Sequence, residues 1–315
     1  MRSEPIDSKP IVRTLDGDHC LSSFGTILTH EHVYAEFGKI SGDDDLNFTD
    51  IDGVSHDLGI LVMSGVDTIV EVSTYDMGNS VIKTDQICRT QGVRVIKSTG
   101  WFRSPYADGV IGNFSVRELT NRLITDIEEA FDGSTLRAGV IGEVGIQGER
   151  CTAVEHRVLS AAVGASLETG AGVITHTDTW PNAVIVVQTL MTLGLPPDRI
   201  IAGHLRCADP VGGQTEMALM GVTLGFDQVG HPKRDGVKEV LARIETLVEA
   251  GVGNRLVISA DQGRRSRLTK NGGTGYAHGI TELLSALQRG GLDGTALSEI
   301  SGSNAAKFLA LRSRA

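Results

Sequence analysis

The chain alternates between short apolar runs and longer stretches with a helical repeat of apolar positions. The eight short runs cover residues 26–30, 67–73, 94–100, 139–145, 172–177, 199–204, 222–227 and 255–261. They are rich in valine and isoleucine, and they are nearly continuous in apolar character rather than alternating. Strands of a parallel sheet that are covered on both faces have this pattern, so each run predicts one such strand.

The stretches between these runs have the periodicity of surface helices. In residues 154–167 the apolar positions are Val154, Val158, Leu159, Val163 and Leu167. Residues 237–248 show the same repeat before the last strand. One apolar stripe of this kind suits a helix that lies on the outside of a sheet. Alternating strands and helices predict right-handed crossovers and a parallel sheet.

Eight predicted strands in 315 residues favour a closed (β/α)8 barrel, which typically takes about 250 residues plus insertions. The alternative is an open doubly wound sheet, which would carry a G-x-G-x-x-G turn after the first strand. Here the first strand leads into THEHVY at residues 29–34 instead. We therefore expect one α/β barrel domain over residues 1–315, with residues 1–24 as an N-terminal extension or small hairpin.

Charge and cysteine content narrow the classes of function and location. The chain has 29 lysine and arginine residues against 39 aspartate and glutamate residues, a formal net charge of −10. This balance disfavours a nucleic-acid or anionic-membrane binder. The four cysteines are far apart and form no CxxC pair, so we expect reduced thiols in a cytoplasmic protein. The chain has no secretory h-region at its start and no run of about 18 apolar residues, so no membrane span is expected.

Residues that commonly bind metal ions lie at or near the ends of five predicted strands. In an α/β barrel the carboxyl ends of the strands form the active-site face. The six candidate ligands are His30, His32, Glu143, His176, His204 and Asp261. His30 and His32 are two positions apart on a strand, so both imidazoles point to the same side. Imidazoles and carboxylates together suit zinc, nickel, cobalt, iron or manganese.

The two carboxylates have distinct expected roles. A bridge between two cations must screen their repulsion at roughly 3.5–4 Å, and Glu143 is the candidate because Gly142 and Gly145 leave room around it. The alternative for Glu143 is a salt bridge to an arginine inside the barrel. Asp261 is the candidate catalytic residue, which binds one metal and accepts a proton from the attacking water. The alternative for Asp261 is the N-cap of a following helix.

These residues lie in segments that resemble the phosphotriesterase-like branch of the amidohydrolase superfamily. The matching segments are GTILTHEHVY at 25–34, EVSTYDMG at 71–78, RAGVIGEVG at 137–145, ITHTD at 174–178, AGHLRCADP at 202–210, GFDQVG at 225–230, VISADQG at 257–263, RLTKNGGTGYAH at 267–278 and SGSNAAKFLAL at 301–311. They cover nearly the whole chain in the right order. The resemblance implies a distorted (β/α)8 TIM barrel with a binuclear metal centre at the carboxyl ends of the strands.

The resemblance also implies which metal ion each ligand binds. His30, His32 and Asp261 match the ligands of the more buried metal. His176 and His204 match the ligands of the more exposed one. The resemblance therefore implies two divalent metal ions, with zinc as the first expectation and manganese, cobalt, nickel or iron as alternatives.

Glu143 departs from the most familiar members of that family, which carry a carboxylated lysine as the bridge between the metals. The chain therefore resembles the glutamate-bridged, phosphotriesterase-homology-type subgroup, and paraoxon-like phosphotriesterase activity is disfavoured. The resemblance implies a hydrolase in which a hydroxide held by the metals attacks a lactone or ester. The alternatives are a phosphoester or N-acyl amide hydrolase, and a catalytically silent barrel that binds only metal or ligand.

Basic residues in the loops after the strands suggest an anionic small-molecule substrate. They are Arg103, Arg206, Lys233, Arg234, Arg264, Arg265 and Arg267. We expect Arg206, Arg264 and Arg265 to contact the anionic group, because guanidinium clamps carboxylate or phosphate. Trp101 and Asp227 are further expected substrate contacts. The alternatives are loop charges that are simply solvated and a tryptophan that only packs its loop. A homodimer is also compatible with the sequence.

Overall fold

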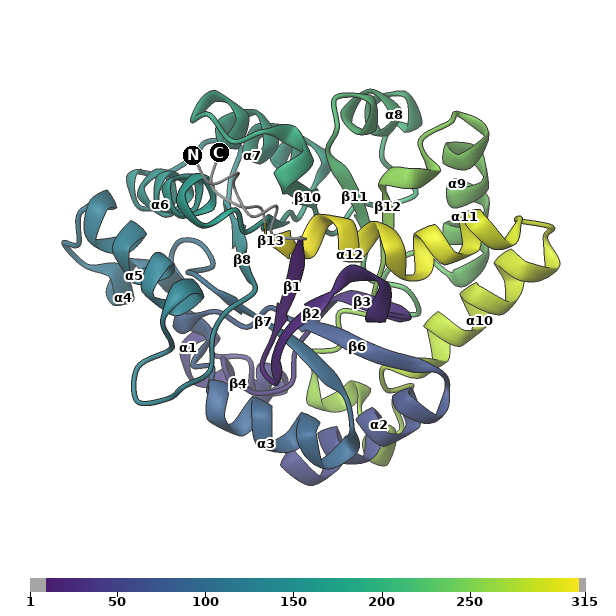
Figure 1. Ribbon diagram of the computed structural model, residues 1–315, viewed down its shortest axis with the longest axis horizontal. Helices are drawn as coiled ribbons and strands as arrows, with labels where there is room; N and C mark the ends of the chain where they lie inside the picture. Colours follow the sequence, from purple (N-terminus) through teal and green to yellow (C-terminus); the bar gives the residue numbers. More distant parts are fainter. Residues whose placement is uncertain (1–9, 312–315) are drawn as a thin grey trace, which may run out of the picture.

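Eight parallel strands form the central ring of the computed structural model, which describes residues 10–311 (Figure 1). The strands are hydrogen-bonded in the order β12-β11-β10-β9-β8-β7-β6-β3. Their bounds are β3 (Thr26–Glu31), β6 (Val66–Glu71), β7 (Arg94–Thr99), β8 (Val140–Gly145), β9 (Val173–His176), β10 (Ile200–Ala202), β11 (Thr223–Phe226) and β12 (Leu256–Ile258). Each predicted run overlaps one of these strands, so the expected (β/α)8 barrel is confirmed.

Helices cover the outside of the ring (Figure 1). They are α1 (Gly38–Ser41), α2 (Ile51–Met63), α3 (Val81–Gln91), α4 (Tyr106–Ile111), α5 (Val116–Glu128), α6 (Ala153–Thr169), α7 (Trp180–Thr192), α8 (Val211–Leu219), α9 (Val237–Glu249), α10 (Ala277–Arg289), α11 (Gly294–Ser298) and α12 (Asn304–Leu309). The predicted helical stretches correspond to α6 and α9. Capping boxes begin two of the helices, with Ser115 and Glu118 at α5 and Thr152 and Glu155 at α6, which satisfies backbone N–H groups that a helix start leaves unpaired.

Branched apolar side chains fill the interior of the barrel. The strands contribute Ile27, Val70, Ile96, Val140, Ile174, Ile201 and Val257, all of them buried. Layers of such side chains make the interior of an α/β barrel a packed core rather than a pore. The polar side chains at the carboxyl ends of the strands therefore stand on a rigid apolar floor.

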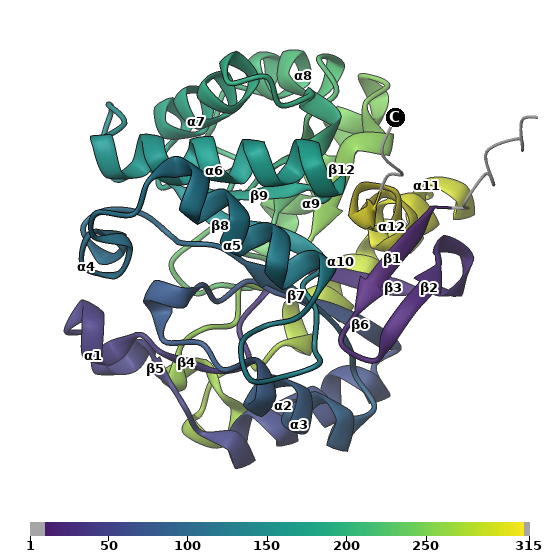
Figure 2. The same cartoon turned by 60° about the vertical axis from the view of Figure 1, so that its left-hand side comes forward.

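A small antiparallel sheet and the last helix cover the amino-terminal end of the barrel. The sheet strands are β1 (Ile11–Thr14), β2 (Gly17–Cys20) and β13 (Ala310–Leu311), and β1 pairs with both others. Val12 and Phe308 from this cover belong to the same apolar cluster as the barrel interior. Figure 2 shows the β1–β2 hairpin and α12 at one end of the barrel and α1 and α4 at the other. Residues 1–9 of the expected N-terminal extension lie outside the described residues.

Side-chain hydrogen bonds and two backbone hydrogen bonds, rather than a regular strand ladder, join β3 to β12 and close the ring. Ser259 Oγ accepts a hydrogen bond from the His30 amide at 2.9 Å, and the Asp261 amide donates to the His30 carbonyl at 3.1 Å. The buried Glu31 carboxylate accepts from Ser259 Oγ at 2.7 Å and from two backbone amides within residues 260–262 at 2.7 and 2.8 Å. This seam places two candidate metal ligands, His30 and Asp261, at fixed positions relative to each other.

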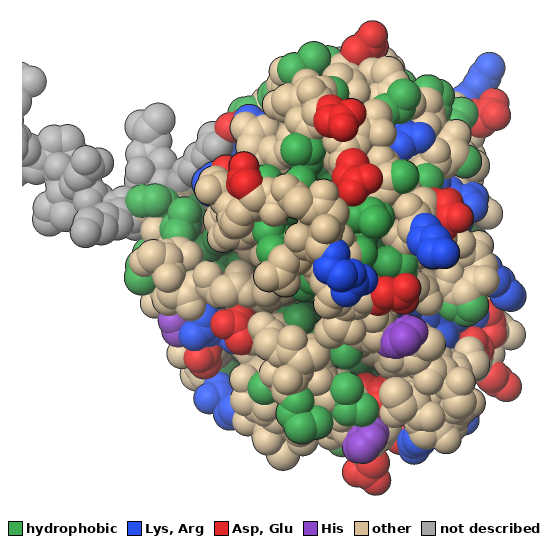
Figure 3. All heavy atoms as spheres, turned by 90° about the vertical axis from the view of Figure 1, so that its right-hand side faces the viewer, with side chains coloured by type: hydrophobic (Ala, Val, Ile, Leu, Met, Phe, Trp, Pro, Cys, Tyr) green, Lys and Arg blue, Asp and Glu red, His purple; other side chains and the backbone are tan. Residues whose placement is uncertain are grey.

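One face of the molecule carries charged side chains of both signs (Figure 3). On the face drawn in Figure 3, acidic and basic side chains are interspersed among apolar and uncharged ones. This face therefore lacks the continuous basic footprint of a nucleic-acid binder. Within residues 10–311, no helix combines the length and apolar character needed to cross a membrane.

A short two-stranded sheet, β4 (Ala35–Glu36) with β5 (Asn47–Phe48), precedes α2.

Candidate metal centre

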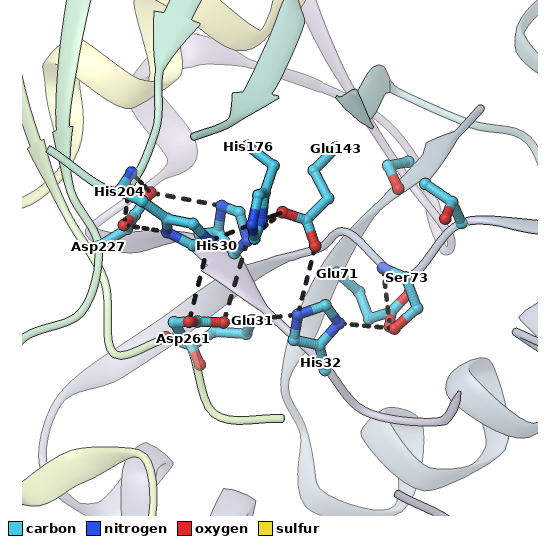
Figure 4. Close-up of polar contacts among 12 residues, drawn as sticks. His30, Glu31, His32, Glu71, Ser73, Glu143, His176, His204, Asp227 and Asp261 are labelled. Carbon is cyan, nitrogen blue, oxygen red and sulfur yellow. Dashed lines mark hydrogen bonds and ion pairs between the residues drawn. The ribbon is translucent and has the colours of Figure 1, made fainter. Parts of the chain in front are cut away.

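Four imidazole rings converge on the carboxylate of Glu143 at the carboxyl end of the barrel (Figure 4). Glu143 Oε2 lies 2.6 Å from His176 Nδ1, 3.2 Å from His30 Nε2 and 3.8 Å from His204 Nε2. Glu143 Oε1 lies 3.7 Å from His32 Nε2. The charged partners of Glu143 are thus histidines, and the alternative of an arginine salt bridge does not describe this arrangement.

Asp261 approaches the same histidines from the end of β12. Its Oδ1 lies 3.5 Å from His32 Nε2 and 4.0 Å from His30 Nε2, and its Oδ2 lies 4.0 Å from His204 Nε2. Gln228 Nε2 donates a hydrogen bond of 2.8 Å to Oδ2. Among the described helices none is capped by the Asp261 side chain. The structure therefore brings all six candidate ligands together.

The outer ring nitrogens of three histidines face polar partners. His204 Nδ1 lies 2.7 Å from Asp227 Oδ1, and His32 Nδ1 lies 2.8 Å from Ser73 Oγ. His30 Nδ1 lies 3.4 Å from Asp227 Oδ2. A hydrogen bond at one ring nitrogen selects the tautomer and orients the other nitrogen toward a metal. In His204 and His32 the nitrogen left available is Nε2, which faces the carboxylates, whereas neither ring nitrogen of His30 forms a hydrogen bond within residues 10–311.

His30 gives the clearest sign that a cation belongs at this centre. Its side chain is fully buried, and within residues 10–311 neither of its ring nitrogens forms a hydrogen bond, although carboxylate oxygens lie 3.2 Å from Nε2 and 3.4 Å from Nδ1. A buried polar atom without a hydrogen bond is in a costly state. Three overlapping groups each have donor atoms within 4.8 Å of one another: His30, His32 and Glu143; Glu143, His176 and His204; and His30, His204 and Asp227. Nitrogen and carboxylate donors in this arrangement fit zinc and related divalent cations.

The histidines also set the charge of the two carboxylates. Burial alone would raise the pKa of Glu143, but protonated His176 and His30 beside it lower that pKa well below its usual range. Burial likewise opposes ionisation of Asp261, yet His204 and His32 lower its pKa. Both carboxylates are therefore ionised at neutral pH and offer two negative charges to bound cations.

Two of the six residues have backbones in the left-handed region, which residues other than glycine seldom adopt. The φ angle is 57° at His204 and 50° at Asp261. Asp227 accepts the His204 amide at 2.9 and 3.0 Å, and the His30 carbonyl accepts the Asp261 amide. These bonds hold the strained backbones in place. Strain of this kind concentrates at functional sites.

A cavity of about 570 Å³ lies at the candidate ligands. The ligands that line it are His32, Glu143, His176, His204 and Asp261. Its walls include the aromatic side chains of Phe37, Phe102 and Tyr106 and the basic side chains of Arg103, Lys233, Arg234, Arg264 and Arg267. Pockets for drug-sized molecules have volumes of roughly 300–1,000 Å³, so the cavity is large enough for an organic substrate.

Of the three arginines that we expected to contact the substrate, one lines the cavity and two do not. Arg264 lines the cavity, but its guanidinium is paired with Asp43 at 2.9 Å and with Asp45 at 3.3 Å. Arg206 and Arg265 are not among the residues that line the cavity, and Arg265 is exposed. A position close to a metal ligand in the sequence therefore does not direct a loop arginine into the cavity.

Trp101 and Asp227 also lie elsewhere than in the cavity wall. Trp101 is buried and packs on Tyr75, with ring centroids 5.6 Å apart. The next residue, Phe102, lines the cavity. Asp227 is buried against His204 and accepts hydrogen bonds from its backbone and ring. Asp227 thus orients a candidate metal ligand, and the expected substrate contacts are corrected for both residues.

Several residues at the site were not among the candidates identified from the sequence. Phe37, Tyr106 and His231 line the cavity from loops and a short helix. Gln228 contacts Asp261 and lies in a segment singled out by its resemblance to the phosphotriesterase-like branch. Ser73 contacts His32 and ends the predicted run 67–73, but a serine at a strand end does not by itself indicate this contact.

Comparison with known proteins agrees with this geometry. The phosphotriesterase homology protein of Escherichia coli is 27% identical over 267 residues, which covers 85% of this chain and 91% of that protein. Its crystal structure, with phosphate in the active site, matches 90% of this chain and 98% of that chain with a TM-score of 0.85 and 26% identity. The N-acetyltaurine hydrolase of Salmo salar is 27% identical over 261 residues, 79% of this chain and 74% of that protein.

A family model matches nearly the whole described chain. It is the model of the phosphotriesterase family, and it covers residues 11–309. That span includes the ring of eight strands, all six candidate ligands and the loops that line the cavity. The chain is a metal-dependent hydrolase that belongs to the phosphotriesterase family.

Proposed function

We propose that the protein hydrolyses a lactone or ester of a small anionic substrate at a centre of two divalent cations. The observation that carries this proposal is the convergence of four ring nitrogens on the Glu143 carboxylate, with the Asp261 carboxylate beside three of the same histidines. An N-acyl amide is the second candidate for the cleaved bond, because several relatives are N-acetyltaurine hydrolases. A phosphoester is the third, because the homologous structure holds phosphate in its active site.

The donor set divides into two groups around the bridging carboxylate. His30, His32 and Asp261 would hold one cation, and His176 and His204 would hold the other. Zinc is the first expectation, and manganese, cobalt, nickel and iron accept the same ligands. When bound, the cations supply Lewis acidity that polarises a carbonyl and lowers the pKa of water toward about 7.

Asp261 is the residue that we assign to proton transfer. Its Oδ1 faces the imidazoles, and its Oδ2 is held by Gln228 Nε2 at 2.8 Å. An ionised carboxylate fixed in this way accepts the proton of the attacking water and then delivers it to the leaving group. The apolar floor below the ligands and the cavity walls restrict water around this proton.

The cations available to bind an anionic substrate group lie in the loop after β11. Lys233 and Arg234 line the cavity, and within residues 10–311 no ion pair joins either side chain to a carboxylate. The Arg264 guanidinium is already neutralised by two aspartates. We therefore assign recognition of a carboxylate, phosphate or sulfonate to Lys233 and Arg234 in place of Arg206 and Arg265. The sulfonate of N-acetyltaurine is one group of this class.

The first test measures metal content and activity together. The protein, purified with zinc or manganese, is analysed by mass spectrometry and screened against lactones, esters, phosphoesters and N-acyl amino acids. We expect about two metal ions per chain and turnover that chelation abolishes. Full activity in protein that contains no metal would contradict the proposal, and metal binding without turnover of any class would favour a silent barrel.

The second test is Asp261→Asn. The amide cannot accept a proton, so kcat should fall by about 10²- to 10⁴-fold, as for other removed acid–base groups. His19→Ala and His56→Ala are the controls, because both histidines lie outside the cavity lining. Wild-type kcat in the asparagine variant would remove Asp261 from the chemistry.

A further inference from the structure

An aromatic wall forms one side of the cavity. It consists of Phe37, Phe102 and Tyr106. The Phe102 and Tyr106 rings are stacked with centroids 5.9 Å apart, and the Phe37 ring meets Tyr106 edge-on at 4.8 Å. The edge of this group touches the candidate metal ligand His176, whose ring lies 4.6 Å from Phe102 at an interplanar angle of 89°. The wall therefore begins directly at the reaction centre.

The charge beside the aromatic wall is neutralised. The Arg103 guanidinium lies 4.9 Å from the Phe102 ring centroid and forms an ion pair with Asp178. The backbone amide of Phe102 donates to the buried carboxylate of Asp76 at 2.8 Å, which fixes where the ring lies. This side of the cavity is thus preorganised, apolar and without a free cation, so it suits an uncharged ring or branched group.

A cationic wall, Lys233 and Arg234, lies across the barrel mouth. Phe102 and Tyr106 follow β7, whereas Lys233 and Arg234 follow β11. Three strands, β8, β9 and β10, separate β7 from β11 in the ring of eight. Positions four strands apart in a ring of eight face each other across its mouth. The candidate metal ligands lie between the two walls.

We infer that the substrate has two unlike ends, an apolar group larger than acetyl at one end and an anionic oxygen group at the other, with the cleaved bond between them. This inference rests on the proposed function and adds its substrate class. An acetyl group alone would leave most of the aromatic wall uncovered in a cavity of about 570 Å³. Lys233 and Arg234 are not paired with a carboxylate of the described chain. A carboxylate, phosphate or sulfonate of the substrate that lies against them therefore gains charge-assisted hydrogen bonds.

Matched substrates test the two ends separately in the metal-loaded protein. They are acetyl and phenylacetyl esters of 2-hydroxyethanesulfonate and of ethanol, together with the corresponding amides of taurine and ethylamine. We expect the highest kcat/KM for the phenylacetyl sulfonates. Replacing phenylacetyl by acetyl should cost about tenfold or more, since even one methylene in an apolar pocket is worth about 10- to 200-fold.

Substitutions in the aromatic wall and in the cationic wall test which wall causes which substrate preference. Phe37→Ala and Tyr106→Ala should reduce the preference for phenylacetyl over acetyl and leave the preference for sulfonate over ethyl. Lys233→Met with Arg234→Met should do the reverse, with a loss of about 10- to 150-fold for the anionic compounds. Phe114→Ala and Lys238→Met are matched controls, because both residues are exposed and outside the cavity lining.

Calorimetry with the Asp261→Asn variant separates the inference from the proposed function. Binding of phenylacetyltaurine in place of acetyltaurine should be at least tenfold tighter in this variant, and Tyr106→Ala in the same background should remove the difference. If turnover and binding do not depend on the acyl group, or do not depend on the sulfonate, the inference is wrong even though the protein is a hydrolase. Two-ended binding without turnover of any of these compounds would count against the proposed function and support the inference.

Discussion

At the residue scale, the partners of the outer ring nitrogens decide which atoms are free to bind a cation. Ser73 Oγ lies 2.8 Å from His32 Nδ1, and Ser73 is fully buried. The Ser73 carbonyl in turn accepts from Lys97 Nζ at 2.7 Å, and Lys97 is paired with the buried Glu71 at 2.8 Å. The ring of His32 is therefore oriented by a chain of buried contacts that extends to β7.

Ser73→Ala should weaken metal binding without unfolding the protein. Loss of the hydroxyl frees the His32 ring to rotate and change tautomer, and removal of such a partner typically costs about 10- to 100-fold in metal affinity. Zinc affinity is measured by competition with a chelating dye, and the midpoint of urea unfolding of the metal-free protein is measured beside it. The matched control is Ser160→Ala, which removes a similar contact of 3.3 Å to His156 Nδ1 at the surface. Equal zinc affinity in both variants would show that Ser73 does not position His32.

His231 predicts a pH dependence of stability. Burial, and next the charge of Arg267, lower the pKa of His231 to about 4, against about 6.5 for an unperturbed histidine. Between these values the unfolded chain binds a proton that the folded chain does not, so stability falls as the pH falls from about 6.5 to about 4. Above about 6.5 His231 is neutral in both states and contributes nothing.

His231→Gln should therefore gain stability relative to the wild type as the pH falls. Glutamine cannot titrate, so the difference in unfolding midpoint should be smallest at pH 7 and grow toward pH 4.5. Urea unfolding at several pH values measures it, with His278→Gln at an exposed position of α10 as the control. A difference that stays constant with pH would show that His231 titrates normally in the folded protein.

Sequence reasoning identified the candidate ligands because each one lies at or near the end of an apolar run. His176 and Asp261 illustrate this, since each lies at or near the carboxyl end of a run whose central residues are buried. The partners that orient the ligands, Ser73 and Asp227, also end predicted runs, but their positions alone do not reveal this role. Only the three-dimensional arrangement shows that they lie 2.8 and 2.7 Å from imidazole nitrogens.

At the element scale, the weak point of the barrel is the seam between β3 and β12. Elsewhere in the ring neighbouring strands share a backbone ladder, but here the Glu31 and Ser259 side chains supply links beside two backbone hydrogen bonds. Glu31 accepts three hydrogen bonds while fully buried. Both oxygens of the Glu31 carboxylate are therefore needed as acceptors, because the backbone amides that they bind would otherwise have no partner.

Glu31→Gln should destabilise the folded protein by about 1–3 kcal/mol, because one amide N–H of β12 or its loop loses its acceptor and remains buried. The free energy of unfolding is measured in urea with zinc absent, so that metal affinity does not enter. Glu282→Gln on the exposed side of α10 is the control. A variant as stable as this control would mean that the seam is held by the backbone contacts alone.

The strands were predictable from sequence and the loops were not, for one physical reason. A strand covered on both faces must be apolar along its length, so its composition reveals it. The direction of a loop side chain depends on contacts with distant segments. Trp101 and Phe102 are equally apolar, but the bond from the Phe102 amide to Asp76 helps set which of the two reaches the cavity.

At the scale of the whole molecule, the barrel couples its stability to the ions that it binds. The candidate ligands lie where five strands end, so two cations held by them would together link β3, β8, β9, β10 and β12. A ligand that binds only the folded chain stabilises it by about 2.7 kcal/mol at a hundred times its Kd. For a chain of 315 residues that corresponds to an increase in Tm of about 4 °C.

The stability of the metal-free fold also depends on pH, through the candidate histidine ligands. Burial opposes the charged form of His30, yet Glu143 and Asp227 raise its pKa well above its usual range in the metal-free protein. The pKa values of His32 and His176 are also raised. Groups with raised pKa values stabilise the metal-free fold below about pH 6.5 and lose that contribution as the pH rises through their folded values.

Metal binding responds to pH in the opposite direction. Imidazole binds a cation only as the neutral ring, so metal affinity rises as these protons leave. The difference in Tm between zinc-loaded and chelator-treated protein should therefore be small at pH 6 and grow toward pH 8.5. Differential scanning calorimetry over this range measures it, and Glu143→Gln, which weakens the shared carboxylate, should reduce the difference at every pH. A difference that shrinks as the pH rises would show that zinc is held by groups other than these imidazoles, because protons and the cation must compete for the same ring nitrogens.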